Sequence, residues 1–441
     1  MANQMPADRG QTSQTKARPH RRKGLGPMAK KEARLAFQML LPTFAIVLAI
    51  VLIPLLANFW ISFKPVKLAD LRPPAPVVSE RVRGDMSVAG AAFTIEYRLR
   101  GSSQSRPIKD IELVDTLPAG VTLLALDPAC TANGNQILCT VELLEPGERK
   151  TLVLNAVGDD AFSAEPVSPR VSKPEISGFA ENVLTSNEFT LDNFKRIFNA
   201  TEFWNVLWVT MAYTIFGTIG ALLFGMFAAQ LLNTAFVGRP ILRGLFLFPY
   251  VAPVIAVAFT WVVLLDPFSG TFNAILVRMN VTEAGINFFG QRMAEFNFFG
   301  LVVPFPLALS SVIAFEIWRY FPLSFLFILA RMQSISTDMY EAAEVDGATP
   351  MQQFWHISLP QLMGILSTLF LLRFIWTFNK FDDIFLLTGG AAGTRTLTVD
   401  VYEQAFAVSN LGAGAAVAVV IFIALLLFAF FFFRFMNREE S

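Results

Sequence analysis

Ionisable side chains stand inside two long apolar stretches of this chain. Glu316 and Arg319 lie one helical turn apart in the first stretch, and Arg373 lies in the second. Three more follow towards the end of the second stretch, namely Lys380, Asp382 and Asp383. Charges inside a membrane span are costly and usually functional. The set therefore predicts either a polar path for a solute or a structural arrangement of ion pairs and side chains that reach the span ends.

Pairing is possible within this set. Glu316 and Arg319 can pair with each other, and Arg373 can pair with an acid from a neighbouring turn or helix. Asp382 and Asp383 lie near the expected outer end of their stretch and could meet water there.

Enzyme chemistry has weak support in the sequence. The two histidines, His20 and His356, have no metal-ligand spacing. A membrane enzyme such as a glycosyl transferase or protease would need converging histidine or carboxylate motifs in its spans. The chain has no G-x-x-x-x-G-K-[ST] motif, so it is not expected to cradle ATP in that manner. We expect no catalytic residue, no metal site and no cofactor held by this chain.

Six apolar stretches can hold these side chains in a bilayer. Apolar residues make up 54% of the chain and charged residues 16%, against about 25% charged residues in a typical soluble domain. A helix needs about 20 apolar residues to cross a bilayer core. The stretches that qualify are 37–63, 206–232, 245–265, 299–330, 363–387 and 411–433. We expect an all-α membrane bundle of six helices, with a proline-induced kink or an interfacial segment at the start of the fourth.

The charge distribution predicts an orientation. Residues 16–34 hold eight Lys or Arg residues against one acid, and positive residues favour the cytoplasmic side. Residues 1–35 are expected to form a basic, disordered cytoplasmic arm, and residues 36–64 the first transmembrane helix. Six crossings then return the C-terminus to the cytoplasm. The zero formal net charge gives no argument for nucleic acid binding.

Residues 65–185 are expected to form a separate domain outside the membrane. Strand-length apolar runs occur at 93–99, 111–114, 121–124, 137–141 and 151–154, and their alternation favours a small antiparallel β-sandwich. Asn133-Gly134 predicts a tight turn between Cys130 and Cys139. In an oxidising compartment a disulfide between these cysteines is favoured over free thiols.

The loop between the fourth and fifth stretches has a helix–turn–helix pattern. Gly347 can end a short helix, and Pro360 can begin the next span. The small side chains of Ala342 and Ala343 would let another protein approach closely. The pattern favours a docking surface over an interfacial loop that lies flat on lipid.

The same loop resembles a family signature. Residues 341–347 read Glu-Ala-Ala-Glu-Val-Asp-Gly, and residues 357–360 read Ile-Ser-Leu-Pro. This pattern resembles the coupling loop of permease subunits of binding-protein-dependent ABC importers. Further likeness to the sugar-importing, maltose-type branch extends over residues 190–436 and includes residues 191–194, 244–250 and 378–390.

The resemblance implies an architecture and a set of partners. Residues 190–436 would form a permease core with transmembrane helices 2–6, and residues 333–360 would form the coupling loop. Implied partners are a second, different permease subunit, two cytoplasmic ATPase subunits that bind ATP and Mg²⁺, an extracytoplasmic sugar-binding protein and membrane lipid. The chain would lie in a bacterial cytoplasmic (inner) membrane with both termini in the cytoplasm. The implied coupling residues are Glu341, Ala342, Ala343, Asp346, Gly347, Ile357, Leu359 and Pro360.

The resemblance also implies a substrate pathway through the fourth and fifth stretches. Trp376 and Tyr320 suit stacking on the apolar face of a sugar ring, but the set departs from the amide and aromatic residues of maltose-type relatives. We expect an oligosaccharide or an α-glucoside such as maltose or trehalose, while Arg319 and Lys380 leave glycerol 3-phosphate or another small polar solute open. The pathway positions are Glu316, Arg319, Tyr320, Leu323, Trp376, Thr377, Asn379 and Lys380.

The extra domain has a resemblance of its own. Residues 114–122 and 130–148 resemble repeated surface β-sandwich domains of bacterial envelope proteins, which implies an immunoglobulin-like fold and no chemistry. The domain would either contact an external partner or only stabilise the protein. An envelope-interaction protein with the spans as its anchor is the third functional class, although one span would be enough for anchoring.

Overall fold

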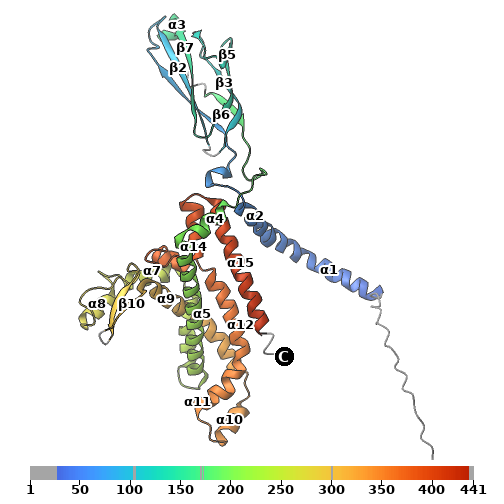
Figure 1. Ribbon diagram of the computed structural model, residues 1–441, viewed down its shortest axis with the longest axis vertical. Helices are drawn as coiled ribbons and strands as arrows, with labels where there is room; N and C mark the ends of the chain where they lie inside the picture. The colour runs from blue at the N-terminus through green and yellow to red at the C-terminus, as the bar shows by residue number, and fades with distance from the viewer. Residues whose placement is uncertain (1–26, 103–105, 169–170, 172, 299–300, 437–441) are drawn as a thin grey trace, which may run out of the picture. The chain divides into compact units, whose positions relative to one another are not determined.

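The computed structural model describes residues 27–102, 106–168, 171, 173–298 and 301–436 (Figure 1). The sequence predicts a disordered arm over residues 1–35, and residues 1–26 of that arm lie outside the described residues. Residues 27–35 are helical instead, because α1 begins at Pro27. Proline suits a first helical turn, where its missing N–H would have no partner anyway.

The first of two compact units ends at Ala57, and its described residues begin at Pro27. In it, α1 (Pro27–Val47) continues through a π-helical turn (Leu48–Leu52) into α2 (Ile53–Ser62), whose residues 58–62 belong to the second unit. The segment Arg34–Ser62 is long and apolar enough to cross a membrane, and none of its most apolar window is buried. Such an all-round apolar helix suits a lipid environment.

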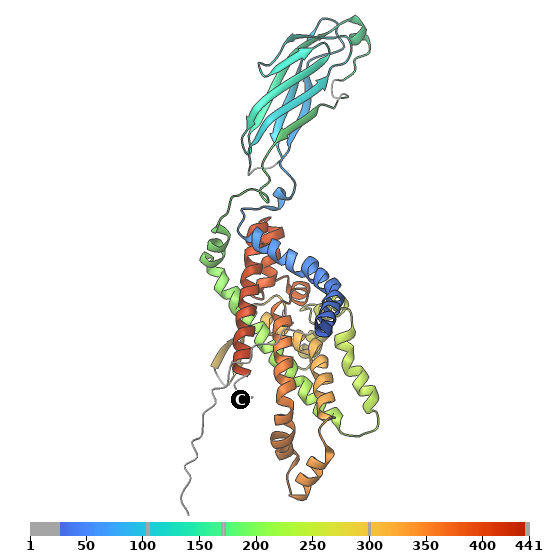
Figure 2. The ribbon, with the colours of Figure 1, turned by 90° about the vertical axis from the view of Figure 1, so that its right-hand side faces the viewer.

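A β-sandwich occupies residues 76–179 within the second unit (Figure 2). Its strands form two four-stranded antiparallel sheets, with orders β1-β2-β7-β4 and β5-β6-β3-β8. Each strand-length run predicted from the sequence lies in one of these strands. The strands are β1 (Pro76–Arg83), β2 (Ala92–Gly101), β3 (Ile108–Thr116), β4 (Val121–Ala125), β5 (Cys130–Asn133), β6 (Gln136–Leu144), β7 (Arg149–Gly158) and β8 (Glu175–Phe179).

The core of the sandwich follows the two-residue period of its strands. On β2, Phe93, Ile95, Tyr97 and Leu99 are buried while the residues between them face outward. The Tyr97 hydroxyl donates a hydrogen bond to buried Asp115 on β3, which belongs to the other sheet. Burial and this hydrogen bond raise the pKa of Tyr97 well above its ordinary value.

The two cysteines lie on one hairpin of this domain. Cys130 on β5 is directly opposite Cys139 on β6, and a disulfide joins them. The turn falls one residue later than the sequence predicts, because Asn133 pairs with Gln136 and leaves Gly134-Asn135 as the two-residue loop. Gly134 has φ +61°, which suits the first loop position of a type II′ hairpin.

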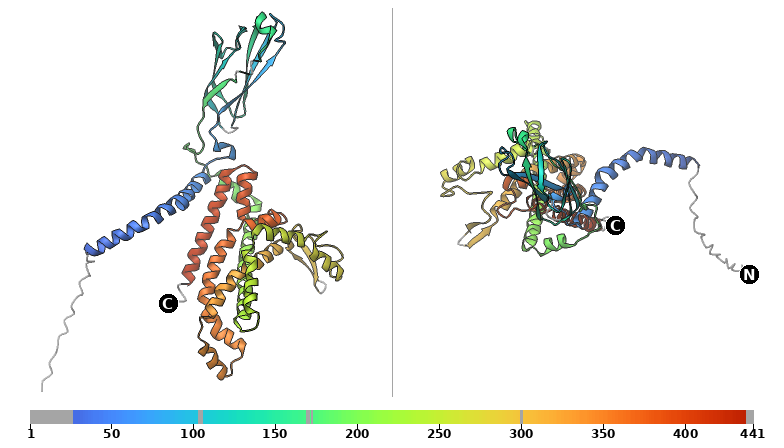
Figure 3. Two further views of the ribbon diagram at one scale, coloured as in Figure 1. Left: turned by 180° about the vertical axis from the view of Figure 1, so that it is seen from behind. Right: turned by 90° about the horizontal axis from the view of Figure 1, so that it is seen from above.

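The helices that follow β8 in the second unit form the helical core. Helices α5, α9, α12 and α15 run side by side (Figure 3), and the hairpin β9 (Ala294–Phe298) and β10 (Leu301–Phe305) precedes α9. The helices are α4 (Asp192–Asn199), α5 (Thr201–Asn233), α6 (Arg239–Val251), α7 (Val254–Leu264), α8 (Thr271–Arg278), α9 (Leu307–Met332), α10 (Thr337–Val345), α11 (Pro350–Gln353), α12 (Leu359–Phe378), α13 (Asp382–Thr388), α14 (Leu397–Tyr402) and α15 (Leu411–Met436).

The number of membrane spans agrees with the six that the sequence predicts only if one bent helix pair is counted as a span. Within the described residues, five helices are long and apolar enough to cross a membrane, and a sixth span exists if α6 and α7 count as one. These two helices are bent by 93°, so the predicted span over residues 245–265 is not one continuous helix. The bend lies at Ala252-Pro253, because proline lacks an N–H and disfavours helix at the residue before it.

Two other predicted spans are shorter than expected. The fourth begins at Leu307 rather than at residue 299, because Pro304 lies in strand β10 and Pro306 is the residue before α9. The fifth ends at Phe378, and a separate short helix α13 covers residues predicted as its continuation.

Glycines allow α5 and α9 to pack closely. A Cβ added at Gly220 would lie 2.2 Å from Ile317 Cδ1, and one at Gly225 would lie 2.8 Å from the backbone nitrogen of Phe325. Small residues at such contacts let helix backbones approach in membranes. This close packing brings the polar residues of α9 next to α5.

Candidate functional site

A buried carboxylate lies where α5, α9 and α12 meet. Glu316 on α9 is fully buried. Its Oε1 accepts hydrogen bonds from Arg373 Nη2 at 2.7 Å and from Thr377 Oγ1 at 3.0 Å, both on α12. Its Oε2 accepts from the Tyr213 hydroxyl on α5 at 2.9 Å. Both oxygens are thus satisfied, as a buried charge requires.

This arrangement corrects one predicted pair and confirms another. Glu316 does not pair with Arg319, although the two lie on one helix. Glu316 points towards α5, where Gly217 leaves room: a Cβ there would lie 2.9 Å from Glu316 Cγ. Arg373 does have an acid partner on a neighbouring helix, as the sequence suggested.

A second group of charges also lies next to Tyr320. Asp383, in the first turn of α13, is fully buried, so the expectation that it meets water is wrong. Its Oδ1 lies 3.9 Å from Arg319 Nε, and its Oδ2 lies 3.7 Å from Lys380 Nζ. Asp382 is about half exposed and lies 3.6 Å from Lys380 Nζ.

The phenol of Tyr320 connects the two groups. Its oxygen accepts hydrogen bonds from Arg319 Nε at 3.2 Å and from the Lys380 ammonium. The charges of Lys380, Arg373 and Arg319 lie 4.3, 4.6 and 5.4 Å from the centre of its ring. The ring that the sequence assigns to sugar stacking therefore contacts three cations.

The structure brings together only part of the predicted pathway. Glu316, Arg319, Tyr320, Thr377 and Lys380 converge, whereas Leu323, Trp376 and Asn379 make none of the polar contacts described for the cluster. Trp376 is 49% exposed, and the amide of Asn379, the residue after α12, donates to the Ile375 carbonyl in the last turn of that helix.

Tyr213 is a member of the site that sequence reasoning missed. It is the single tyrosine of α5, and it stands one turn before Gly217. A phenol in an otherwise apolar helix, one turn from a glycine, was the available signal. The sequence also placed Arg373 and Asp383 near the pathway without including them in it.

The predicted coupling loop, residues 333–360, contains α10, α11 (Figure 1), a π-helical turn (Phe354–Ser358) and the first two residues of α12. Gly347 has φ +77°. Its N–H donates to the Glu344 carbonyl, and the Ala348 N–H donates to the Ala343 carbonyl. These two bonds form a Schellman motif, which needs a left-handed residue at the glycine position. The sequence prediction that Gly347 ends the helix is confirmed.

The surface of this loop is open in the structure. Glu341, Ala342, Asp346 and Gly347 are exposed, and Val345 is 88% exposed. No ion pair involves Glu341 among the described residues. The Tyr340 hydroxyl and Ser358 Oγ lie 2.9 Å apart, which ties α10 to the start of α12. Ile357 and Leu359 are half-buried, and Pro360 stands in the first turn of α12.

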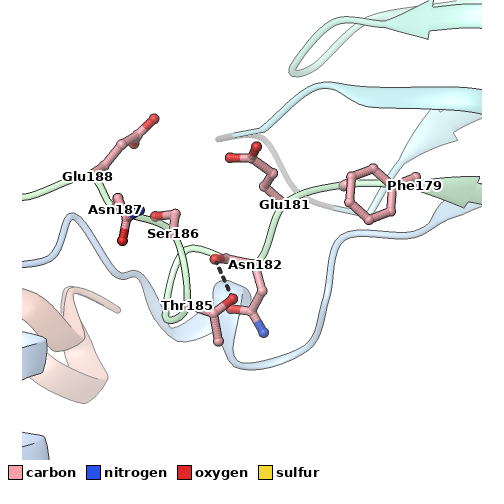
Figure 4. Close-up of a pocket in the computed structure, with 8 residues that line it drawn as sticks. Phe179, Glu181, Asn182, Thr185, Ser186, Asn187 and Glu188 are labelled. Carbon is pink, nitrogen blue, oxygen red and sulfur yellow. Dashed lines mark hydrogen bonds between the residues drawn. The ribbon is translucent and has the colours of Figure 1, made fainter.

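A pocket also lies along residues 179–188, after β8 (Figure 4). The Thr185 hydroxyl donates to the Asn182 carbonyl at 3.3 Å, so part of its polar lining belongs to a turn. Glu188 pairs with Arg106, and this hydrogen bond lowers the pKa of the carboxyl group. The pocket has no converging charges comparable with those around Tyr320.

Comparison with known proteins identifies a family. The family described as binding-protein-dependent transport system inner membrane component matches residues 221–440. The inner membrane ABC transporter permease protein YcjO of Escherichia coli is 35% identical over 248 residues, which cover 55% of this chain and 79% of the relative. The trehalose/maltose transport system permease protein MalF of Thermococcus litoralis is 33% identical over 50% of this chain and 70% of its own length.

A third relative and a solved structure extend this result. The sn-glycerol-3-phosphate transport system permease protein UgpA of Escherichia coli O6:K15:H31 is 29% identical over 52% of this chain and 73% of its own length. A bacterial ABC transporter that imports alginate shares the fold with a TM-score of 0.50 at 20% identity, over 58% of this chain and 86% of that one. The chain therefore belongs to the family of membrane-embedded permease subunits of binding-protein-dependent ABC transporters, which are transport components rather than enzymes.

Proposed function

We propose that this chain is one permease subunit of an ATP-driven importer, and that it moves a sugar across the cytoplasmic membrane by alternating access. The expected cargo is an oligosaccharide or an α-glucoside such as maltose or trehalose, in line with the trehalose/maltose relative. The chain would act with a second permease subunit, two ATPase subunits that bind ATP and Mg²⁺, and an extracytoplasmic binding protein.

One observation carries the proposal. The coupling loop joins α9 directly to α12, and these two helices supply Glu316, Arg319, Arg373 and Thr377 to the buried polar cluster. A force applied to α10 by an ATPase would therefore act on both helices that hold the cluster. ATP hydrolysis in partner subunits could in this way change access to the solute path.

A second cargo has a specific observation in its favour. Arg319 and Lys380 place two cations beside Tyr320, and cations suit a phosphate group. A relative at 29% identity is a glycerol-3-phosphate permease. Glycerol 3-phosphate is therefore the alternative cargo.

The coupling role is tested by Glu341→Ala and Gly347→Ala in cells that also express the partner subunits. We expect both variants to lose uptake of the cargo while the chain still inserts into the membrane. Alanine at φ +77° is strained and shifts the end of α10, whereas loss of Glu341 removes an exposed acid that suits an arginine on an ATPase.

A glycine in the β-sandwich gives a matched control. Gly147 has φ +79°, and like Gly347 it has no atom within 4 Å of an added Cβ. Gly147→Ala introduces the same backbone strain away from the loop, so uptake should persist. Normal uptake in both loop variants would contradict the proposed coupling. The cargo is identified by measuring ATP hydrolysis by the assembled complex with maltose, trehalose or glycerol 3-phosphate, each supplied with its binding protein. The ligand that stimulates hydrolysis is the cargo.

A further inference from the structure

Two polar groups meet at Tyr320, and they differ in how well their atoms are hydrogen-bonded. The anchor cluster comprises Glu316, Arg373, Thr377 and Tyr213. In it, both carboxylate oxygens of Glu316 accept hydrogen bonds, and Arg373 Nε is the buried side-chain atom without a partner. The cluster links α5, α9 and α12, so Glu316 acts as a positioning residue.

The open cluster comprises Arg319, Lys380 and Asp383. The Asp383 side chain is completely buried, yet neither of its oxygens accepts a hydrogen bond. Arg319, whose side chain is 9% exposed, has its Nη1 atom buried without a partner. Buried polar atoms nearly always have hydrogen-bond partners, and exceptions require an explanation. Asp383 thus has ion-pair contacts with Arg319 and Lys380, but its two oxygens and Arg319 Nη1 have no hydrogen-bond partner.

The chemistry of a ligand for this cluster can be derived from these atoms. A hydroxyl group donates one hydrogen bond and accepts others, so one hydroxyl can satisfy Asp383 and Arg319 together. A phosphate dianion can only accept, and it would meet the Asp383 carboxylate as a like charge. Arg319 and Lys380 already have carboxyl groups of Asp382 and Asp383 as ion-pair partners, so an anion would have to compete with these groups for both cations.

We propose that Asp383 is a specificity-determining residue that accepts hydrogen bonds from the hydroxyl groups of an uncharged sugar and rejects anionic solutes. This inference rests on the proposed sugar permease. Arg319 and Lys380 donate to the same hydroxyl groups, and Tyr320 holds both cations in place. On this inference the cargo is a neutral polyhydroxy compound, and the acid at position 383 disfavours the alternative cargo, glycerol 3-phosphate.

The test uses the purified complex of this chain with its permease and ATPase partners, without the binding protein, so that the selectivity of the binding protein does not enter. A ligand that binds the folded complex raises its unfolding temperature. Maltose, trehalose and glycerol 3-phosphate are titrated separately, and an apparent affinity is obtained from the shift. We expect either sugar, but not glycerol 3-phosphate, to stabilise the wild-type complex.

Asp383→Asn should reverse this preference. The apparent sugar affinity should fall about tenfold or more, the usual effect of losing a hydrogen bond to a charged group, and glycerol 3-phosphate should now stabilise the complex. Glu316→Gln should lower the starting unfolding temperature without a change of preference. Asp192→Asn removes an exposed acid on α4 that forms an ion pair with Lys195. It should change neither the unfolding temperature nor the ligand preference of the complex.

Several outcomes would overturn the inference. They are stabilisation of the wild type by glycerol 3-phosphate, no response to either sugar, or unchanged sugar affinity in Asp383→Asn. Each leaves the coupling test at Glu341 and Gly347 unaffected, so failure of the specificity role can be told apart from failure of the permease proposal.

Discussion

At the residue scale, the buried pair of Glu316 and Arg373 makes a strong prediction about stability. Removing one member leaves the other charge buried without compensation, which typically costs about 3–5 kcal/mol. We expect Arg373→Met to lower the free energy of unfolding by that order. Glu316→Gln combined with Arg373→Met should restore part of the loss, because no buried charge then remains in the pair. Unfolding of the purified complex in detergent would measure both.

An exposed pair provides the control for this prediction. Lys195 and Asp192 on α4 lie 3.7 Å apart, with side chains 69% and 80% exposed. Pairs of this kind contribute about 0–1 kcal/mol, so Lys195→Met should have little effect. If the double variant of Glu316 and Arg373 instead loses the sum of the free energies lost by the two single variants, the two side chains do not stabilise each other, and the prediction is wrong.

At the element scale, the contact of α5 with α9 depends on Gly225. A Cβ there would lie 2.6 Å from Ser324 Cβ and 2.8 Å from the Phe325 backbone nitrogen. Because a backbone cannot move aside as a flexible side chain can, Gly225→Ala should cost about 1–3 kcal/mol, as overpacking usually does. Thermal unfolding of the complex in detergent gives the measurement.

Gly244 on α6 is the matched comparison. It is also helical, but an added Cβ meets no atom within 4 Å. Gly244→Ala should therefore be neutral or slightly stabilising, since alanine favours helix more than glycine does. An equal loss in both variants would point to a general effect of alanine rather than to the α5–α9 contact.

The elements also show which features a sequence can predict. The alternation of apolar and polar residues marked the strands of the sandwich, because each strand has one face buried in the core and one face exposed. The length of the apolar stretches marked α5 and α15, because a helix that crosses a bilayer core needs about 20 apolar residues. The length of an apolar stretch says nothing about its direction, so the bend between α6 and α7 was missed although Pro253 stands there. The segment before α9 was expected as a kink or an interfacial segment, and it is the strand β10, which contains Pro304. The partner of Glu316 was missed because it depends on which helices pack together, and spacing along one helix does not contain that information.

At the scale of the whole molecule, the bent pair α6 and α7 decides the topology. If the pair crosses the membrane, the chain has six spans, and the coupling loop faces the side opposite to the β-sandwich. If the pair enters and leaves on one side, five spans remain, and the loop and the sandwich share a side. The basic segment before the first span favours a cytoplasmic N-terminus, which would place the sandwich and its disulfide outside.

Two cysteine substitutions distinguish these topologies. Lys150 on β7 and Val345 at the end of α10 are both exposed, and the described residues contain no free cysteine that would compete. We expect a membrane-impermeant maleimide to label Lys150→Cys in intact cells and Val345→Cys only in inverted vesicles. Labelling of both in intact cells would mean that α6 and α7 do not cross. The coupling loop would then be out of reach of a cytoplasmic ATPase, and the proposed transport mechanism would fail with it.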